Sequence, residues 1–267
     1  MKKSLPLSME SIYQFVSLVV AIIMVHAAYI GVIRPKGQAF LDAQSAMMKA
    51  DPSHVVPTSV YVVLQDYEQE SCFVLLVWAM AIIGFKGVAT IRNRALLSND
   101  LIPVAEGMRI LPEDAHDLSR QIQALPPGRR ESLLPRALLA GLQRFSLTRS
   151  IQAVSEATHA YCATEGERLD SELSMIRYIA WAIPSIGFLG TVRGIGEALG
   201  HAHKALEGDI FDVTRSLGIA FNSTLIALLI SILLMFLIHQ LQLVQERYVL
   251  DTEAYCEENL TRHLQVP

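Results

Sequence analysis

Two hydroxyl-bearing residues, Thr191 and Thr224, combine a reactive side chain with a place inside a long apolar segment. Ser223 and Asn222 precede the second threonine and add further polar groups. A hydroxyl both donates and accepts hydrogen bonds, so a pair can hold a water or a partly dehydrated cation without a fixed charge that would trap it. We therefore expect Thr191, Thr224, Ser223 and Asn222 to lie along an ion pathway.

The two threonines are expected at one depth in the membrane. At about 1.5 Å per residue, Thr191 lies roughly 22 Å above Ile176, the inner end of its segment. By the same rise, Thr224 lies roughly 21 Å above Ile238. That level is beyond the bilayer midplane toward the outside, where an ion-binding ring could be reached from the outer face.

Small residues recur every three or four positions along both segments, and such ridges let helices approach closely. They are Pro184, Gly187, Gly190 and Gly194 in the first segment and Ala220, Ala227 and Ser231 in the second. Ridges of this kind occur in ordinary helix packing as well as around pores. The common depth of the threonines favours the pore, and we expect these small residues to line its wall.

Carboxylates are missing from the deep part of every apolar segment. The nearest, Glu197, lies toward the outer end, where it can pair with Arg193 at i, i+4 in an outer vestibule. Conduction by a carboxylate relay would therefore need a second polypeptide. His26, deep in the N-terminal apolar segment at 11–33, could relay protons, but a packing histidine bonded to a neighbour is the favoured interpretation.

Composition places the chain in the bilayer. Its residues are 52% hydrophobic and 18% charged, and the mean hydropathy is +0.35. A net charge of -4 offers no basic field to attract nucleic acid. The three cysteines are far apart, which predicts free thiols and no metal site. We find no nucleophile elbow, phosphate loop or paired carboxylates, so we expect no catalytic residues, no cofactor and no enzyme. No inverted repeat supports a secondary transporter.

Four segments are long enough to cross a bilayer core, which predicts an all-α fold of four membrane helices with a helical cytoplasmic extension. They are 11–33, 70–91, 176–199 and 215–239. The second is short in its strictly apolar part and needs Lys86 to extend toward the lipid headgroups. The third, broken by Pro184, glycines and charges, should score weakly in hydropathy.

The spans divide the chain into parts. We expect N-terminal spans in 1–91 with an outer loop at 34–69, a cytoplasmic helical insertion at 92–175, a channel core at 176–240 and a cytoplasmic helical tail at 241–267. Turns are predicted at Pro103, Pro112 and Pro126-Pro127-Gly128, and Arg136 to Leu173 reads as a helical extension with few breakers. With both termini in the cytoplasm, 16 of the 22 basic residues lie inside, as the positive-inside rule requires.

The motifs resemble those of a known family. Gly187-Phe188-Leu189-Gly190-Thr191-Val192-Arg193-Gly194-Ile195 is similar to the G-L-F-G-T-V-W-G-I signature of the MotA/TolQ/ExbB proton-channel family. Ser223-Thr224-Leu225-Ile226-Ala227-Leu228 is similar to the threonine motif of that family's last span. Arg193 departs from the pattern by replacing an aromatic residue. Two spans before the insertion resemble the topology of MotA.

The resemblance implies a function and partners. It implies a homopentamer in the bacterial inner membrane around two copies of a single-span MotB/ExbD/TolR-like subunit, whose intramembrane Asp carries the ion past each threonine pair. The transported ion would be H+, with Na+ as the alternative, and a driven machine would contact the cytoplasmic or outer side. The competing hypothesis is a membrane scaffold that assembles a complex without conducting.

Overall fold

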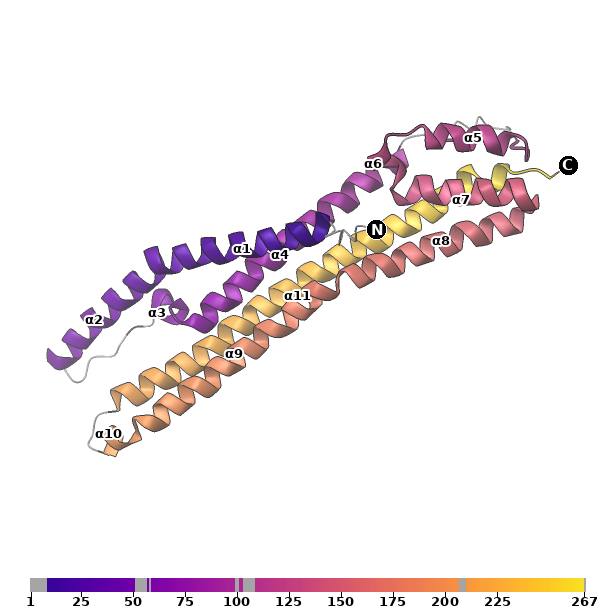
Figure 1. Cartoon of the computed structure of the whole chain (residues 1–267). Coiled ribbons are helices and arrows are strands. Elements are labelled where there is room, and N and C mark those ends of the chain that lie inside the picture. Colours follow the sequence, from indigo (N-terminus) through magenta and orange to yellow (C-terminus); the bar gives the residue numbers. More distant parts are fainter. Residues whose placement is uncertain are drawn as a thin grey trace, which may run out of the picture. The chain divides into compact units, whose positions relative to one another are not determined.

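The computed structural model describes residues 9–50, 57, 59–98, 101–102, 109–206 and 210–266, and these are almost entirely helical (Figure 1). In order, the helices are α1 (Met9–Ala28), the π-helical η1 (Tyr29–Ile33), α2 (Arg34–Ala50), α3 (Val60–Leu64), α4 (Tyr67–Arg94), the 3-10 helix η2 (Ala95–Ser98), α5 (Asp114–Gln123), α6 (Pro127–Arg130), α7 (Leu133–Thr148), α8 (Ile151–Glu172), α9 (Ser174–Gly200), α10 (Ala202–Leu206), α11 (Phe211–Asn259) and the 3-10 helix η3 (Thr261–His263). The predicted all-α fold is confirmed.

Four helical segments within the described residues are long and apolar enough to cross a membrane. They are Met9–Gln44, Tyr67–Ser98, Ile151–Gly200 and Phe211–His263. Each contains one of the four predicted spans, so the chain is a membrane protein whose described residues hold the predicted number of candidate spans. The most apolar stretch of the third is less apolar than that of the other three. Its expected weak score follows from the charges and small residues that it carries.

The chain divides into two compact units. The first comprises Met1–Ile83 and Met175–Ile238, and the second comprises Gly84–Ser174 and His239–Pro267. Helices α4 and α11 each contribute residues to both units.

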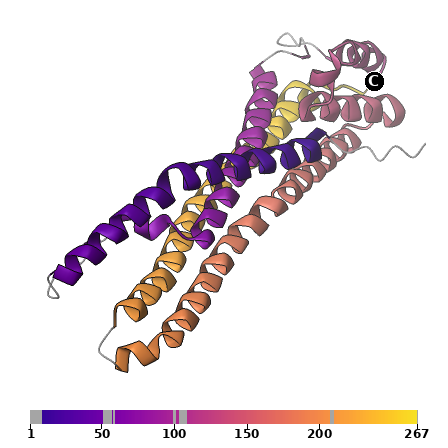
Figure 2. The ribbon, with the colours of Figure 1, turned by 60° about the vertical axis from the view of Figure 1, so that its left-hand side comes forward.

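The first unit holds the apolar helices. Here α1, η1 and α2 form one uninterrupted helix, so much of the predicted outer loop at 34–69 is helical. Alanines recur through α2, and alanine has the highest helix propensity, which explains why the helix continues past Ile33. Helices α9 and α11 run side by side as a hairpin in both views (Figures 1 and 2).

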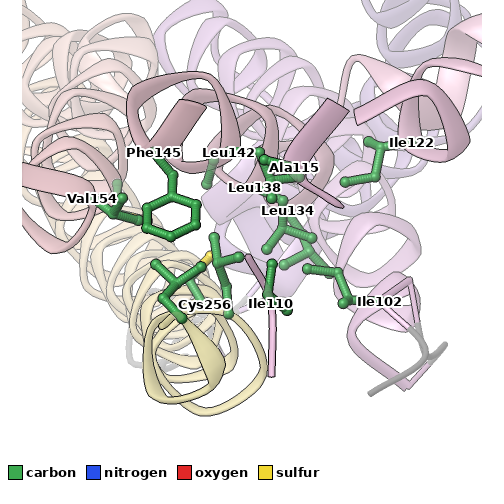
Figure 3. Packing of buried hydrophobic residues seen from close by; sticks show 14 of the residues in the cluster. Ile102, Ile110, Ala115, Ile122, Leu134, Leu138, Leu142, Phe145, Val154 and Cys256 are labelled. Carbon is green, nitrogen blue, oxygen red and sulfur yellow. The ribbon is translucent and has the colours of Figure 1, made fainter. Parts of the chain in front are cut away.

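The second unit has an apolar core built from α5, α7, α8 and the last part of α11. Leu138, Leu142 and Phe145 of α7 are fully buried against Val154 of α8 and Cys256 of α11. Figure 3 shows these side chains converging from the three helices. The predicted helical tail after the fourth span is confirmed, and it supplies one wall of this core.

The stretch from Arg136 to Leu173 is helical, as predicted, but it forms two helices, α7 and α8, in place of a single extension. The helix reverses at Arg149, whose φ of 48° is left-handed, and α7 and α8 form a hairpin. The side chain of Ser150 caps α8 by accepting a hydrogen bond from the backbone N–H of Ala153 at 3.3 Å. The available signal was the capping serine Ser150, since no Gly or Pro lies beside the reversal. Of the predicted turns, Pro112 precedes α5, Pro126 is the N-cap of α6 and Pro127-Gly128 form its start, while Pro103 lies outside the described residues.

Lys86 was expected to extend toward the lipid headgroups, but its side chain pairs within the protein. Its side chain is 4% exposed, and its ammonium donates to Glu172 Oε2 at 2.8 Å. Both residues belong to the second unit. The carboxylate of Glu172 is partly exposed, at 24%, and gives the buried ammonium a hydrogen-bonding partner within the same unit.

Candidate ion-pathway site

The α9 and α11 hairpin brings the two predicted threonines together. The side-chain hydroxyls of Thr191 and Thr224 contact each other directly. Thr191 also lies 3.0 Å from the carbonyl oxygen of Ala220, and Thr224 lies 3.0 Å from that of Gly187. The two residues therefore lie at one level, as the helical rise predicts, and each reaches the backbone of the opposite helix.

The hydrogen-bonding capacity of this pair is limited by its two protons. If one hydroxyl donates to the other, the second donates to a backbone carbonyl, and both oxygens keep a lone pair free. Each hydroxyl can also rotate about its Cβ–Oγ bond. The pair can thus accept from a water, a hydronium or a protonated carboxyl, and it can turn a proton outward toward a carboxylate. It does so without net charge.

Glycines permit this close approach. A Cβ added at Gly190 would lie 2.5 Å from the Ser223 hydroxyl, and one at Gly194 would lie 2.8 Å from the backbone nitrogen of Ala220. Real Cβ atoms do not approach backbone that closely, so only glycine fits at Gly194 unless the helices separate.

The predicted small-residue ridges face each other inside one chain. Gly187, Gly190 and Gly194 of α9 are buried, as are Ala220 and Ala227 of α11. They bring the two helix backbones together, which is the packing interpretation of such ridges. Their proposed place on a pore wall stays a prediction.

Pro184 and Ser231 form an unexpected link between the same helices. A proline inside a helix leaves the carbonyl four residues earlier without its N–H partner, here that of Ala180. The Ser231 hydroxyl donates to this carbonyl oxygen at 3.1 Å. The two ridge residues therefore act together, because one frees an acceptor and the other satisfies it.

Of the other two predicted pathway residues, Ser223 shares both backbone acceptors of the threonine pair, whereas Asn222 lies apart from it. Ser223 is 1% exposed, and its hydroxyl lies 2.8 Å from the Ala220 carbonyl oxygen and 3.2 Å from that of Gly187, within the helix contact. Asn222 is two residues before Thr224, about 200° around the helix. Its side chain makes no hydrogen bond within the described residues.

The threonine pair is reached from one side of the hairpin. Phe188 and Phe221, each three residues before a threonine and thus on its face, are 64% and 65% exposed. The other side packs on α4, where the Cys72 thiol lies 3.7 Å from the Ile183 carbonyl oxygen. One face of the hairpin is therefore covered within the chain, and the face with the hydroxyls is open.

Arg193 pairs with carboxylates. Its guanidinium donates to both oxygens of Glu68 on α4, at 2.7 and 2.9 Å, and to Glu197 at 2.9 Å. The predicted Arg193 to Glu197 pair is present, but the bidentate bond to Glu68 was missed. Burial raises the pKa of the Asp66 carboxyl beside this cluster, and Arg193 opposes the rise. The arginine thus ties α9 to the start of α4, and its predicted vestibule role stays untested.

A second carboxylate, Glu70, was also missed. It is 8% exposed, lies 2.5 Å from Nδ1 of His26, and accepts a further hydrogen bond from Arg34. The guanidinium of Arg34 also lies 4.3 Å from the centre of the Tyr67 ring. His26 is thus bonded to a neighbour, as the packing interpretation predicts. Two glutamates in the first turn of an apolar helix were the available signal, since a helix N-terminus stabilises acidic groups.

Comparison with known proteins supports the resemblance that the sequence motifs indicated. Residues 129–254 match the model of the MotA/TolQ/ExbB proton channel family, so the resemblance predicted from the motifs is confirmed. The matched range includes α7, α8, α9 and most of α11, with both threonines. Neither a search of curated proteins nor one of solved structures returned a significant match. The family consists of channel subunits rather than enzymes, and no cluster of His, Cys, Asp or Glu suited to a metal occurs in the described part of the chain.

Proposed function

We propose, from the match of residues 129–254 to the MotA/TolQ/ExbB proton channel family, that this chain is the channel-forming subunit of an ion-driven motor. In this proposal a homopentamer surrounds two copies of a single-span MotB/ExbD/TolR-like subunit. Ion flow past an Asp of that subunit drives rotation or other mechanical work. The complex lies in the bacterial inner membrane, with both termini of this chain in the cytoplasm.

The observation that carries the proposal is the direct contact of Thr191 with Thr224 on the open face of the hairpin. The exposed rings of Phe188 and Phe221 flank the pair and would exclude bulk water once a partner helix covers it. A hydroxyl pair in apolar surroundings offers an ion a hydrogen-bonding site that does not bind it tightly. A partner carboxyl can move past such a site.

The partner carboxyl is needed because this face lacks an acid. Glu68 is bonded to Arg193. Glu70 is bonded to His26 and Arg34. A protonated partner Asp would donate to a threonine oxygen, and a deprotonated one would accept from a rotated hydroxyl. The same pair then serves both protonation states as the ring and its partner turn.

Protons are the favoured ion, with sodium as the alternative. Thr191, Thr224 and the carbonyls of Gly187 and Ala220 present neutral oxygens at one level, and oxygens are also the ligands that small hard cations take. Proton uptake measured in the presence and absence of sodium would separate the two ions.

The test of the assembly is copurification of the chain with the product of the neighbouring gene, followed by native mass spectrometry. The proposal predicts five copies of this chain with two copies of a single-span protein that carries an intramembrane Asp. A monomer or dimer without such a protein would contradict it and would leave the scaffold as the better account.

The scaffold hypothesis has its own observation, since Gly187, Gly190 and Gly194 are used in packing within the chain. The two functions differ in what Thr191→Val should do. Valine keeps the shape and removes the hydroxyl, so the motor would lose ion flow while a scaffold would assemble and work as before.

A further inference from the structure

We propose that adjacent copies of this chain dock through an acidic groove between α8 and α11 and a basic edge formed by α6 and α7. Both surfaces lie in the second unit. The inference deepens the proposed homopentamer and rests on it in one respect: identical copies must stand side by side with the same orientation in the membrane.

The acidic groove has an apolar floor and a charged rim. It encloses about 780 Å³, with Leu169, Val249 and Leu250 among its lining residues and Glu167 and Glu246 at its margin. A second hollow continues it along α8 and α11 and is lined by Glu253 and Glu257. An apolar centre with a polar rim is the usual anatomy of a protein interface.

The groove is acidic because both of the helices that line it carry more acidic than basic residues. Helix α8 carries five acidic residues and one arginine, and residues 239–259 of α11 carry the same numbers. Some of these acids are paired, as in Glu253 with His159 at 2.7 Å. Glu167, Glu246 and Glu257 form no ion pair within the described residues. The rim therefore favours a basic occupant.

The basic edge has the complementary composition. From Pro127 to Thr148, helices α6 and α7 and the turn between them carry four arginines and one glutamate. The arginines are Arg129, Arg130, Arg136 and Arg144; all are exposed, and the described part of the chain supplies no ion pair to any of them. Beside them, Pro126 and Pro127 expose apolar rings. Two apolar rings flanked by arginines match an apolar floor flanked by carboxylates.

The two surfaces lie at the same levels along the second unit. The backbone N–H of Leu133, at the start of α7, donates to the Tyr248 hydroxyl at 3.3 Å. Farther along α7, Gly141 lies directly against Thr158 and Leu260. Arg130 is therefore level with the part of the groove near Glu246, and Arg136 is level with the part between Glu246 and Glu257. Rotation about an axis along the helices would bring them opposite each other.

The surfaces also lie on different sides of the unit. The buried face of α7 packs on α8 and α11, which leaves Arg136 and Arg144 on its outer face. On α11 the buried residues are Tyr248 and Cys256, whereas Leu250 of the groove is 63% exposed. Two different complementary patches make a head-to-tail contact, which closes into a ring when the rotation between copies is suitable.

The test uses cysteine crosslinking in intact membranes between two differently tagged, coexpressed copies. One copy carries Gly128→Cys, beside the basic edge, and the other carries Leu250→Cys, in the groove. Gly128 has no atom close to a Cβ placed on it, and the three native cysteines are buried, so background should be low. The expected product is a crosslinked dimer of unlike copies. Absence of that product, or equal crosslinking between two Gly128→Cys copies, would overturn the proposal.

Charge reversal tests the electrostatic match in the same assay. Arg130→Glu or Glu246→Arg alone should lower the crosslinking yield about tenfold, because like charges then face each other. The two changes in one chain should restore the yield. Arg120→Glu, on α5, is the matched control and should leave it unchanged. If each reversal lowers activity without lowering the yield, the groove binds another protein and the self-docking proposal fails.

The assay separates this inference from the proposed function. Crosslinking needs no ion gradient, so Thr191→Val should leave the yield unchanged even where ion flow is lost. A crosslinked assembly that never conducts would contradict the motor and leave the docking surfaces in place.

Discussion

Different interactions stabilise the inside of each of the two units. In the first, α9 and α11 meet through glycine, alanine and hydroxyl groups, with Thr191 and Thr224 bonded to the opposite backbone. In the second, α7 packs through fully buried Leu138, Leu142 and Phe145. Between helices in lipid there is no hydrophobic driving force, so close fit and hydrogen bonds stabilise their contact, whereas the core of the second unit rests on buried apolar side chains.

This difference also separates the places where chemistry can occur. The polar groups of the first unit lie at its helix contact, because packing itself depends on them. Those of the second unit lie mainly on its surface, outside the apolar core. A change in the first unit should therefore alter stability and ion passage together, while one in the second should alter stability or assembly.

The largest expected effect comes from a substitution in the core of the second unit. Phe145→Ala should lower the free energy of unfolding by about 3–5 kcal/mol, since it removes a ring that is fully buried. Thermal unfolding of the full chain in detergent measures it. Leu147→Ala, at an 81% exposed position of the same helix, is the control and should change stability by about 0.5 kcal/mol or less. Equal effects would contradict the assigned core.

In the first unit the matching experiment adds a methyl group. Gly194→Ala should cost about 1–3 kcal/mol, because the new Cβ would press on the backbone of Ala220 and Ser216. Gly196→Ala has open space around it and should be neutral or slightly stabilising. Comparing their melting temperatures tests whether close backbone approach holds this hairpin. An unaffected Gly194→Ala would mean that it does not.

The bidentate hydrogen bond from Arg193 to Glu68 of α4 should contribute less to stability. Arg193→Gln would leave Glu68 without its fork of donors and should destabilise the first unit by about 1–2 kcal/mol. Arg193→Lys keeps the charge but not the fork and should recover only part of that loss. Melting temperatures at two salt concentrations distinguish charge from geometry. Full recovery by lysine would show that the fork is unimportant.

The smallest expected effect is the link between Pro184 and Ser231. Ser231→Ala should cost about 0.5–1 kcal/mol, because the Ala180 carbonyl loses its donor. In a chain that also carries Pro184→Ala, position 184 regains an N–H for that carbonyl, and the serine change should become neutral. Unfolding of the two single variants and the double variant forms the cycle. Purely additive effects would rule out the link.

Sequence alone predicted the architecture because span length and apolar content are local properties. The four crossings, the helical tail and the common level of Thr191 and Thr224 follow from counting residues along helices. It missed the reversal at Arg149, which depends on one left-handed residue and a serine cap. It also could not find the partners of Lys86, since those depend on which helices become neighbours.

The candidate site was predicted in part for the same reason. Thr191 and Thr224 stood out by type and by position. The links from Glu68 to Arg193 and from Glu70 to His26 join residues far apart in the chain, and helical periodicity carries no information about such pairs. Asn222 was placed with the threonines by sequence proximity, although helix rotation separates it from them.

The most direct test of the central claim is ion flow through the purified complex in liposomes, followed with a pH-sensitive dye under an imposed gradient. Thr191→Val should abolish the flow while native mass spectrometry gives an unchanged assembly, and Thr191→Ser, which restores the hydroxyl, should conduct. A valine variant that conducts as well as the unchanged chain would contradict the assignment of the hydroxyl pair to the ion pathway.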